Sequence, residues 1–296
     1  MGRVKNYLSL IKFSHTIFAM PFAMIGFSLG LIQSRLSDHS EAVTQSWLKL
    51  LLLVLLCMIF ARSAAMAFNR WLDRHFDAKN PRTSIREIPA GIISANSALT
   101  FTMISAFLFI LTTFFINRIC FYLSPVALLV ILGYSYTKRF TPLCHLVLGI
   151  GLSLAPIGAY LAVTGRFAVL PILFSLAVIF WVSGFDIIYA LQDEEFDKSL
   201  NLYSMPSWVG KSNALNISVG LHILCAICVI AAGLYGSFGL WYWIGLSVFM
   251  GMLLYQHSIV KPQDLSRVNL AFMTANGIAS VVFSVFVITD LLARAT

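Results

Sequence analysis

Two short segments of the chain, 69–77 and 186–197, hold seven of its twelve Asp and Glu residues. Oxygen-bearing side chains recur in them at intervals close to whole helical turns, at Asn69, Asp73 and Asp77 in the first segment and at Asp186, Asp193 and Asp197 in the second. On a helix, each of these sets shares one face. Mg2+ binds carboxylate oxygens together with substrate phosphates. Two such faces turned toward one cavity would suit a Mg2+ ion that holds a diphosphate.

Basic residues lie close to the first segment, where a diphosphate would need them. Arg82 and Arg86 follow it within ten residues and could contact phosphate oxygens that the metal leaves free. A topology that gathers positive charge in cytoplasmic loops explains both arginines, but not the aspartates beside them. Lys138 and Arg139 end a later apolar stretch just after Tyr134, and they could either hold the diphosphate or anchor a helix at the interface.

Two further residues lie deeper in apolar sequence. Arg62 precedes Asn69 by seven residues, on the same helix face, and could neutralise an aspartate or bind the carboxylate of an acidic substrate. Asp186 lies beside Tyr189 and deeper than the rest of its segment, so it requires a partner there. Glu194, by contrast, fits a solvated helix end, as does the glutamate after it.

The elements that position these residues are membrane spans. The chain has 296 residues, of which 59% are hydrophobic and only 11% are charged, as is typical of a polytopic membrane protein. No linker divides it, so a single domain over 1–296 is expected. The predicted fold class is an all-α bundle of nine transmembrane helices, at about 12–32, 47–68, 97–116, 118–137, 142–164, 168–192, 213–235, 238–258 and 269–292.

The basic residues predict the orientation of this bundle. Fourteen Lys and Arg residues fall on one side and five on the other, with Arg62 inside a span. The positive-inside rule then places the N-terminus and both acidic segments in the cytoplasm and the C-terminus outside. Two polar loops, 78–96 and 193–212, follow the acidic segments and could cap the space beside them. A nucleic-acid partner is not expected, because the basic residues lie in short loops.

Other polar residues in the spans fit packing roles. Cys225 and Cys228 have the spacing of a metal or redox pair, but no second pair or nearby His completes a ligand set, so apolar filling is favoured. His15 and His222 are interpreted as satisfied bundle residues, and Asn276 as a hydrogen-bonding residue between helices.

The two acidic segments resemble the motifs of the UbiA superfamily of intramembrane prenyltransferases. The first family motif, N-D-x-x-D-x-x-x-D with a following basic-Thr pair, corresponds to Asn69, Asp73, Asp77, Arg82 and Thr83. The second, D-x-x-Y-A-x-x-D-x-x-x-D, corresponds to Asp186, Tyr189, Ala190, Asp193 and Asp197. Arg62 and the stretch from Tyr134 to Lys138 also match elements of ubiquinone-type members. Arg70 stands where the family usually has Asp, which leaves the subfamily open.

This resemblance implies an intramembrane polyprenyltransferase of the bacterial cytoplasmic membrane that uses Mg2+ and has its active site toward the cytoplasm. It implies a polyprenyl diphosphate donor, and an aromatic acid acceptor that is either 4-hydroxybenzoate or, on a menaquinone route, 1,4-dihydroxy-6-naphthoate. Its expected metal ligands are Asn69, Asp73, Asp186 and Asp193. The expected catalytic set is Asp73, Asp77, Asp186, Asp193, Asp197 and Tyr189. The expected substrate-binding set is Arg62, Arg82, Arg86, Tyr134, Lys138 and Arg139.

Two other classes of membrane protein share some of these features. A secondary transporter also carries intramembrane Asp and Arg, but usually at mid-membrane in helices that are broken by Gly or Pro. A CDP-alcohol phosphotransferase is a Mg2+-dependent, Asp-rich enzyme, but its D-G-x-x-A-R and G-x-x-x-D spacing is not found here. Prenyl transfer therefore remains the favoured function.

Overall fold

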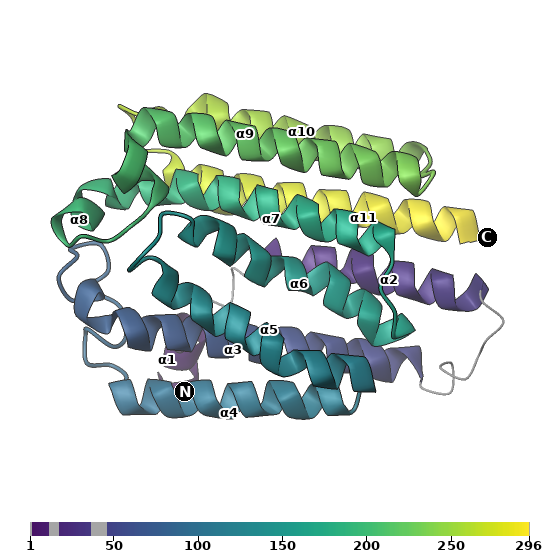
Figure 1. Ribbon diagram of the computed structural model, residues 1–296, viewed down its shortest axis with the longest axis horizontal. Coiled ribbons are helices and arrows are strands. Elements are labelled where there is room, and N and C mark those ends of the chain that lie inside the picture. Colours follow the sequence, from purple (N-terminus) through teal and green to yellow (C-terminus); the bar gives the residue numbers. More distant parts are fainter. Residues whose placement is uncertain (1, 12–17, 37–45, 296) are drawn as a thin grey trace. The chain divides into compact units, whose positions relative to one another are not determined.

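The computed structural model describes residues 2–11, 18–36 and 46–295, and within these ranges the chain is helical, with one isolated β-bridge between Lys261 and Asp264. The all-α class is confirmed for this part of the chain (Figure 1). The α-helices are α1 (Gly2–Leu10), α2 (Met20–Leu36), α3 (Trp47–Asp77), α4 (Ala95–Phe114), α5 (Arg118–Thr137), α6 (Cys144–Thr164), α7 (Val169–Ala190), α8 (Glu194–Ser199), α9 (Met205–Tyr235), α10 (Leu240–Ile259) and α11 (Asn276–Ala295). A 3-10 helix, η2 (Leu191–Asp193), and a π-helix, η3 (Leu270–Ala275), complete the set.

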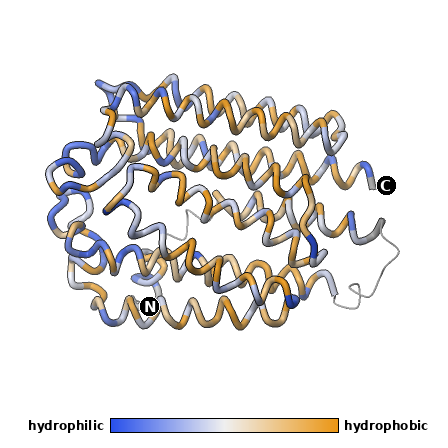
Figure 2. The backbone as a smooth tube through the Cα atoms, viewed as in Figure 1, coloured by the Kyte–Doolittle hydropathy of each residue, from blue (hydrophilic) through white to orange (hydrophobic). Residues whose placement is uncertain are grey.

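Seven helical stretches among the described residues are long and apolar enough to cross a membrane. They are α3, α4, α5, α6, α9, the run from α7 to α8, and the run from η3 into α11. Figure 2 shows the hydrophobic residues along these helices. The described part of α2 is shorter, and α10 carries polar and aromatic residues such as Trp241, Gln256 and His257. The chain is thus a multi-pass membrane protein, while nine spans remain a prediction.

The chain forms two compact units, the first from residues 1–16 and 51–136 and the second from 17–50 and 137–296. In the first unit, a small apolar cluster joins α1, α3 and α4 through the buried residues Leu10, Ala67, Ile93 and Ala98. Ser94 begins α4 because its side chain accepts a hydrogen bond from the backbone N–H of Ser97. The polar segment before it consists of turns, as the sequence predicts for 78–96.

The second unit is built around α7, which packs against α6 on one side and α9 on the other. Helix α2 packs against α6 and α11, and α10 packs against α11. Asn276 lies in the buried interior and accepts hydrogen bonds from Trp181 Nε1 and Gln256 Nε2, both at 3.0 Å. These contacts confirm its interpretation as a hydrogen-bonding residue between helices, since α7, α10 and α11 meet there.

Two other packing interpretations are confirmed and one falls outside the described residues. Cys225 and Cys228 are free thiols on α9, and Cys225 is fully buried in the apolar core. His222 Nδ1 lies 2.8 Å from His257 Nε2, and His222 Nε2 lies 3.3 Å from the carbonyl oxygen of Trp181. His15 belongs to the segment 12–17, which lies outside the described ranges.

The segment 193–212 differs from the polar loop that the sequence predicts. It contains α8 and the first turns of α9, joined by a short connection (Figure 1). Ser204 caps α9 in a reciprocal pair of hydrogen bonds with Ser207. Gly210 then interrupts α9 with φ 80°, a conformation that glycine adopts without steric cost. The start of α9 therefore belongs structurally with α8, next to the second acidic segment.

Candidate active site

The first acidic segment lies on one continuous helix. Helix α3 continues past the apolar stretch to Asp77, so Asn69, Asp73 and Asp77 share a face as their spacing predicts. Asn69 Nδ2 donates to Asp73 Oδ2 at 3.1 Å and to Ser135 Oγ of α5 at 3.4 Å. Asn69 and Asp73 are both only partly buried.

Asp77 has a different environment from the two residues before it. It is only 6% exposed. Arg86 Nη1 lies 2.6 Å from its Oδ1, and Arg70 Nη1 lies 4.0 Å from its Oδ2. Both guanidinium groups offset the charge of this carboxylate. Arg86 therefore forms an ion pair with Asp77 in this structure. Arg70, the departure from the family motif, is itself buried on the same side of α3.

Arg82 lies in the turns that follow α3. Its backbone N–H donates to Asn80 Oδ1 at 2.9 Å, and Thr83 Oγ1 donates to the carbonyl oxygen of Asp77 at 3.2 Å. These bonds fold the turn back on the end of α3. The other expected substrate-binding residues of this unit, Arg62 on α3 and Tyr134 on α5, are partly buried.

The second acidic segment is not one helix face, so that prediction from spacing is wrong here. Asp186 lies in α7, but α7 ends at Ala190 and is followed by η2. Asp193, at the end of η2, has φ −105° and ψ 4°, which breaks the helical path before α8 begins. Asp197 lies in α8, with its side chain redirected by this break.

Asp186 has the buried partner that its depth requires. His145, on α6, places Nδ1 2.7 Å from Asp186 Oδ2. The opposite ring nitrogen, Nε2, lies 3.2 Å from the backbone nitrogen of Met205. The Asp186 side chain remains 24% exposed, whereas that of His145 is 4% exposed. Sequence reasoning missed His145, because the only signal is a His at the start of a predicted span, far from Asp186 in the chain.

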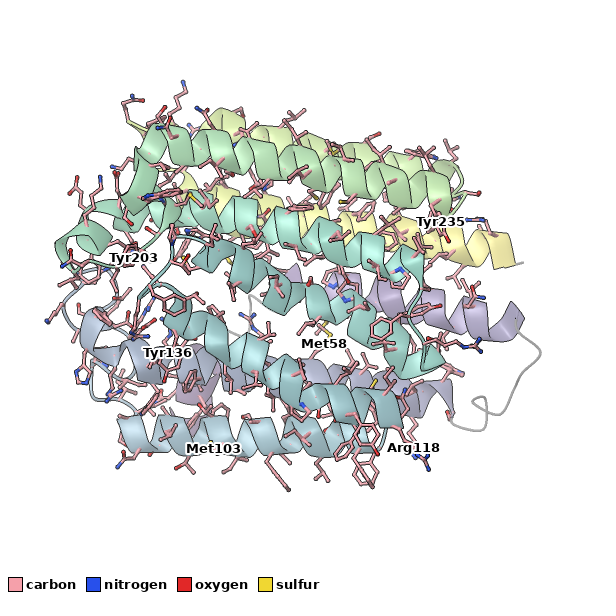
Figure 3. The ribbon with its side chains drawn as sticks, in the orientation of Figure 1. Met58, Met103, Arg118, Tyr136, Tyr203 and Tyr235 are labelled. Carbon is pink, nitrogen blue, oxygen red and sulfur yellow. The ribbon has the colours of Figure 1, made fainter. Side chains whose placement is uncertain are left out.

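Asp197 contacts two connecting segments, the one between α5 and α6 and the one between α8 and α9. Its side chain is fully buried, with Lys138 Nζ 2.7 Å from Oδ1, and Ser204 Oγ donates to Oδ2 at 2.8 Å. The backbone N–H of Tyr203, at the turn between α8 and α9 (Figure 3), donates to the carbonyl oxygen of Lys138 at 2.7 Å. Burial opposes the charge on Lys138, but the carboxylates of Asp197 and Asp193 outweigh it and raise its pKa above the ordinary value.

The remaining residues of the second segment lie nearby. Tyr189 packs its ring on Phe272, with centroids 4.3 Å apart. Asp193 is 9% exposed, and Arg139 is partly buried. Glu194 corrects an expectation, because it is 8% exposed and its Oε1 lies 2.6 Å from Lys198 Nζ. Its neighbour Glu195 is exposed, as expected.

The donor set fits Mg2+ in kind. Among the described residues, no group of three or more His, Cys, Asp or Glu side chains is gathered as a metal site. Mg2+ does not need one, because it is usually bound by one or two carboxylates, waters and substrate phosphates. The partly exposed carboxylates of Asp73 and Asp186 are of the right type. Asp77 and Asp197 already have basic partners, which suits them to a supporting role.

Residues 39–278 match the UbiA prenyltransferase family. The chain belongs to this family. Its motif segments, both inside the matched range, therefore stand in a membrane prenyltransferase, and the enzyme class predicted from the sequence is confirmed. A 4-hydroxybenzoate octaprenyltransferase from Nitrosomonas europaea is 32% identical over 238 residues, which cover 79% of this chain and 80% of that protein. One from Nitrosospira multiformis is 31% identical over 252 residues, covering 84% and 85%.

Solved structures share the fold. A UbiA homologue from Aeropyrum pernix K1 superposes with a TM-score of 0.77 at 26% identity, covering 95% of this chain and 98% of that one. A UbiA homologue from Archaeoglobus fulgidus bound to GPP and Mg2+ has a TM-score of 0.70 at 21% identity, covering 97% and 99%. The helical architecture of this chain is thus that of the UbiA family.

Proposed function

We propose that this prenyltransferase transfers a polyprenyl group from polyprenyl diphosphate to 4-hydroxybenzoate, in quinone biosynthesis at the cytoplasmic face of a bacterial inner membrane. The observation that carries the proposal is the similarity, at 31–32% identity over about four-fifths of the chain, to 4-hydroxybenzoate octaprenyltransferases. The positive-inside distribution of Lys and Arg supports the cytoplasmic orientation.

The proposed ligands of a Mg2+ ion are the motif residues Asn69, Asp73, Asp186 and Asp193. When bound, this ion would offset the charge of the diphosphate and so favour breakage of the allylic C–O bond. Arg82 and Arg139 would bind phosphate oxygens and add positive charge where the leaving group develops negative charge. The diphosphate leaves with the bonding electron pair, and the allylic cation needs a site from which water is excluded.

The acceptor half of the reaction forms a C–C bond on the aromatic ring, ortho to the hydroxyl, and releases a ring proton to a base. An acidic acceptor needs a cation for its carboxylate. Arg62 is proposed for this role, because it lies on α3 two turns deeper than Asn69 and is partly buried. Tyr134 and Tyr189 are proposed to line the site, and Lys138 and Arg86 to act through the buried aspartates that they neutralise.

A second acceptor belongs with this proposal, because the first motif departs from the family pattern at one position. Arg70 replaces an Asp of the first family motif and is engaged near Asp77. This departure from the usual family motif leaves the subfamily open, so 1,4-dihydroxy-6-naphthoate, on a menaquinone route, is the alternative acceptor. Both acceptors are hydroxylated aromatic acids, so the same site chemistry serves either.

The deciding experiment offers both acids, each with a long-chain polyprenyl diphosphate and Mg2+, to the purified protein in detergent. The Asp73→Ala variant tests the motif, and Glu195→Gln is the matched control, because it removes an exposed carboxylate from the other cluster. A prenylated product from 4-hydroxybenzoate, lost with EDTA and with Asp73→Ala but not with Glu195→Gln, supports the proposal. Product from the naphthoate alone supports the second acceptor. No product and no release of diphosphate from the donor with either acid would contradict both acceptors.

A further inference from the structure

The donor and the acceptor of the hydrogen bond between His145 and Asp186 can be assigned. A backbone N–H can only donate, and the nitrogen of Met205 lies 3.2 Å from His145 Nε2, so this ring nitrogen accepts. A neutral imidazole that accepts at Nε2 carries its proton at Nδ1. Nδ1 lies 2.7 Å from Asp186 Oδ2 and therefore donates to the carboxylate. The first turn of α9 thus determines which tautomer meets Asp186.

The backbone that carries this imidazole packs closely against α7. Ser183 Oγ, on α7, lies 3.1 Å from the backbone carbonyl oxygen of His145 and 2.6 Å from that of Ile179, so its one proton is shared between them. One turn further along α6, a Cβ on Gly149 would lie 2.5 Å from the carbonyl oxygen of Ile179 and 2.6 Å from Ser183 Oγ. The absence of a side chain at Gly149 lets α6 approach α7 closely. His145 is therefore fixed by its own helix, by α7 and by α9.

We infer that His145 is a positioning residue that orients Asp186 for the metal. Its Nδ1–H occupies Oδ2, so Oδ1 is the oxygen left to meet a cation at the exposed side of Asp186. Carboxylates that bind metals are commonly held by a second hydrogen bond of this kind, and loss of the holding residue weakens metal binding. The inference rests on the proposed role of Asp186 as a Mg2+ ligand. It adds a residue outside both aspartate motifs, contributed by α6.

The test compares His145→Leu with His145→Gln in the full chain. Leu removes the donor, whereas the amide of Gln can donate to Asp186. Binding of Mn2+ in the presence of inorganic pyrophosphate, followed by the electron paramagnetic resonance signal of free Mn2+, reports metal affinity without turnover. We expect His145→Leu to weaken Mn2+ binding by about 10- to 100-fold and His145→Gln to restore most of it. The Mg2+ concentration for half-maximal prenyl transfer should shift in parallel.

A matched control separates positioning from stability. His222, on α9 of the same unit, is likewise 4% exposed but pairs with His257. His222→Leu should lower the unfolding temperature while leaving Mn2+ binding unchanged. If His145→Leu behaves in the same way, with lower stability but unchanged Mn2+ affinity, the inference is wrong.

The Asp186→Ala variant distinguishes the inference from the proposed function on which it rests. If Asp186→Ala leaves Mn2+ binding unchanged, the metal role of Asp186 and the inference are both overturned. If Asp186→Ala weakens binding but His145→Leu does not, only the inference falls. If the inference holds, His145→Leu weakens Mn2+ binding in the wild-type background but adds little to Asp186→Ala, because the two residues then act as a pair.

Discussion

The two acidic clusters, which are the segments 69–77 and 186–197, each end in a buried aspartate. The residues that contact these two aspartates come from different parts of the chain. Asp77 and Asp197 are both buried, and each contacts a basic side chain. The partner of Asp77 is Arg86, nine residues later. The partner of Asp197 is Lys138, from the connection between α5 and α6, with Ser204 from the start of α9. Asp77 is therefore held by its own helix and the turns that follow it, whereas Asp197 is held by two segments outside its helix.

This difference separates binding from support within each cluster. The earlier carboxylates, Asp73 and Asp186, stay partly exposed and are suited to a ligand. The last ones, Asp77 and Asp197, stabilise the chain around the site. We therefore expect substitutions of Asp73 and Asp186 to reduce activity, and substitutions of Asp77 and Asp197 to reduce stability first.

The largest effect is expected at the exposed acids. Asp73→Asn and Asp186→Asn each remove one charge from the proposed metal site, and loss of several kcal/mol of charge stabilisation lowers kcat/KM by roughly 10³-fold. Unfolding in a denaturant titration should shift little. Prenyl transfer and unfolding are measured on the same preparations. Equal losses of stability and activity in these two variants would remove the distinction between exposed and buried acids.

The next largest effect concerns the two buried ion pairs, Asp77 with its arginines and Asp197 with Lys138. In the first, loss of the acid should destabilise the protein more than loss of the base, and in the second the order should be reversed. In the first pair, Arg70 is a buried base beside Asp77, so Asp77→Asn strands a buried charge and should cost about 3–5 kcal/mol of unfolding free energy. In the second pair, the carboxylate of Asp197 is the buried partner, while Lys138 is 35% exposed. Lys138→Met should therefore cost more than Asp197→Asn, whose stranded ammonium can reach water.

The matching variant of the first pair is Arg86→Met, which leaves Asp77 near Arg70. We expect it to cost only about 1–2 kcal/mol, less than Asp77→Asn. Denaturant titration of the four variants gives the comparison, with Glu195→Gln as the exposed control on α8. If removal of the acid is the costlier change in both pairs, the assignment of the buried partner in the second pair is wrong.

The pH dependence of stability refines the comparison at Lys138. Its pKa is raised in the folded protein, so its contribution is complete below the ordinary lysine value of about 10.4 and is lost as pH rises through the higher folded value. At alkaline pH the wild-type protein should approach the stability of Lys138→Met. Lys138→Arg, which stays charged, should lack this loss. Unfolding temperatures from pH 8 to pH 11 measure it, and parallel curves for wild type and Lys138→Arg would contradict it.

The sequence predicted the first cluster better than the second for a physical reason. Helical spacing places Asn69, Asp73 and Asp77 correctly because α3 is continuous. The same reasoning fails for the second cluster, because Asp193 leaves the helical region of φ and ψ, and a single turn there redirects every later side chain. Apolar stretches located most helices closely, including α5 at Arg118–Thr137.

Residue spacing does not predict contacts between side chains that are far apart in the chain. His145 meets Asp186 across 41 residues, and nothing local to either residue indicates the pairing. The burial of Glu194 likewise depends on Lys211 from α9 as well as on its own helix neighbour. Ion pairs inside one turn or helix follow from sequence, whereas those that connect helices require the packed structure.

The smallest effect concerns two serine caps, one in each unit. Ser94 caps α4 at an exposed position, with the N–H of Ser97 3.1 Å from its oxygen, so Ser94→Ala should cost about 1 kcal/mol. Ser204 caps α9 but also donates to Asp197, and both are fully buried. Ser204→Ala should therefore cost about 2 kcal/mol, because it leaves a buried carboxylate oxygen without its donor as well as removing the cap. Equal losses in denaturant titration would mean that Lys138 alone supports Asp197. A larger loss for Ser204→Ala would show that the second cluster depends on the start of α9, the same segment that fixes the tautomer of His145.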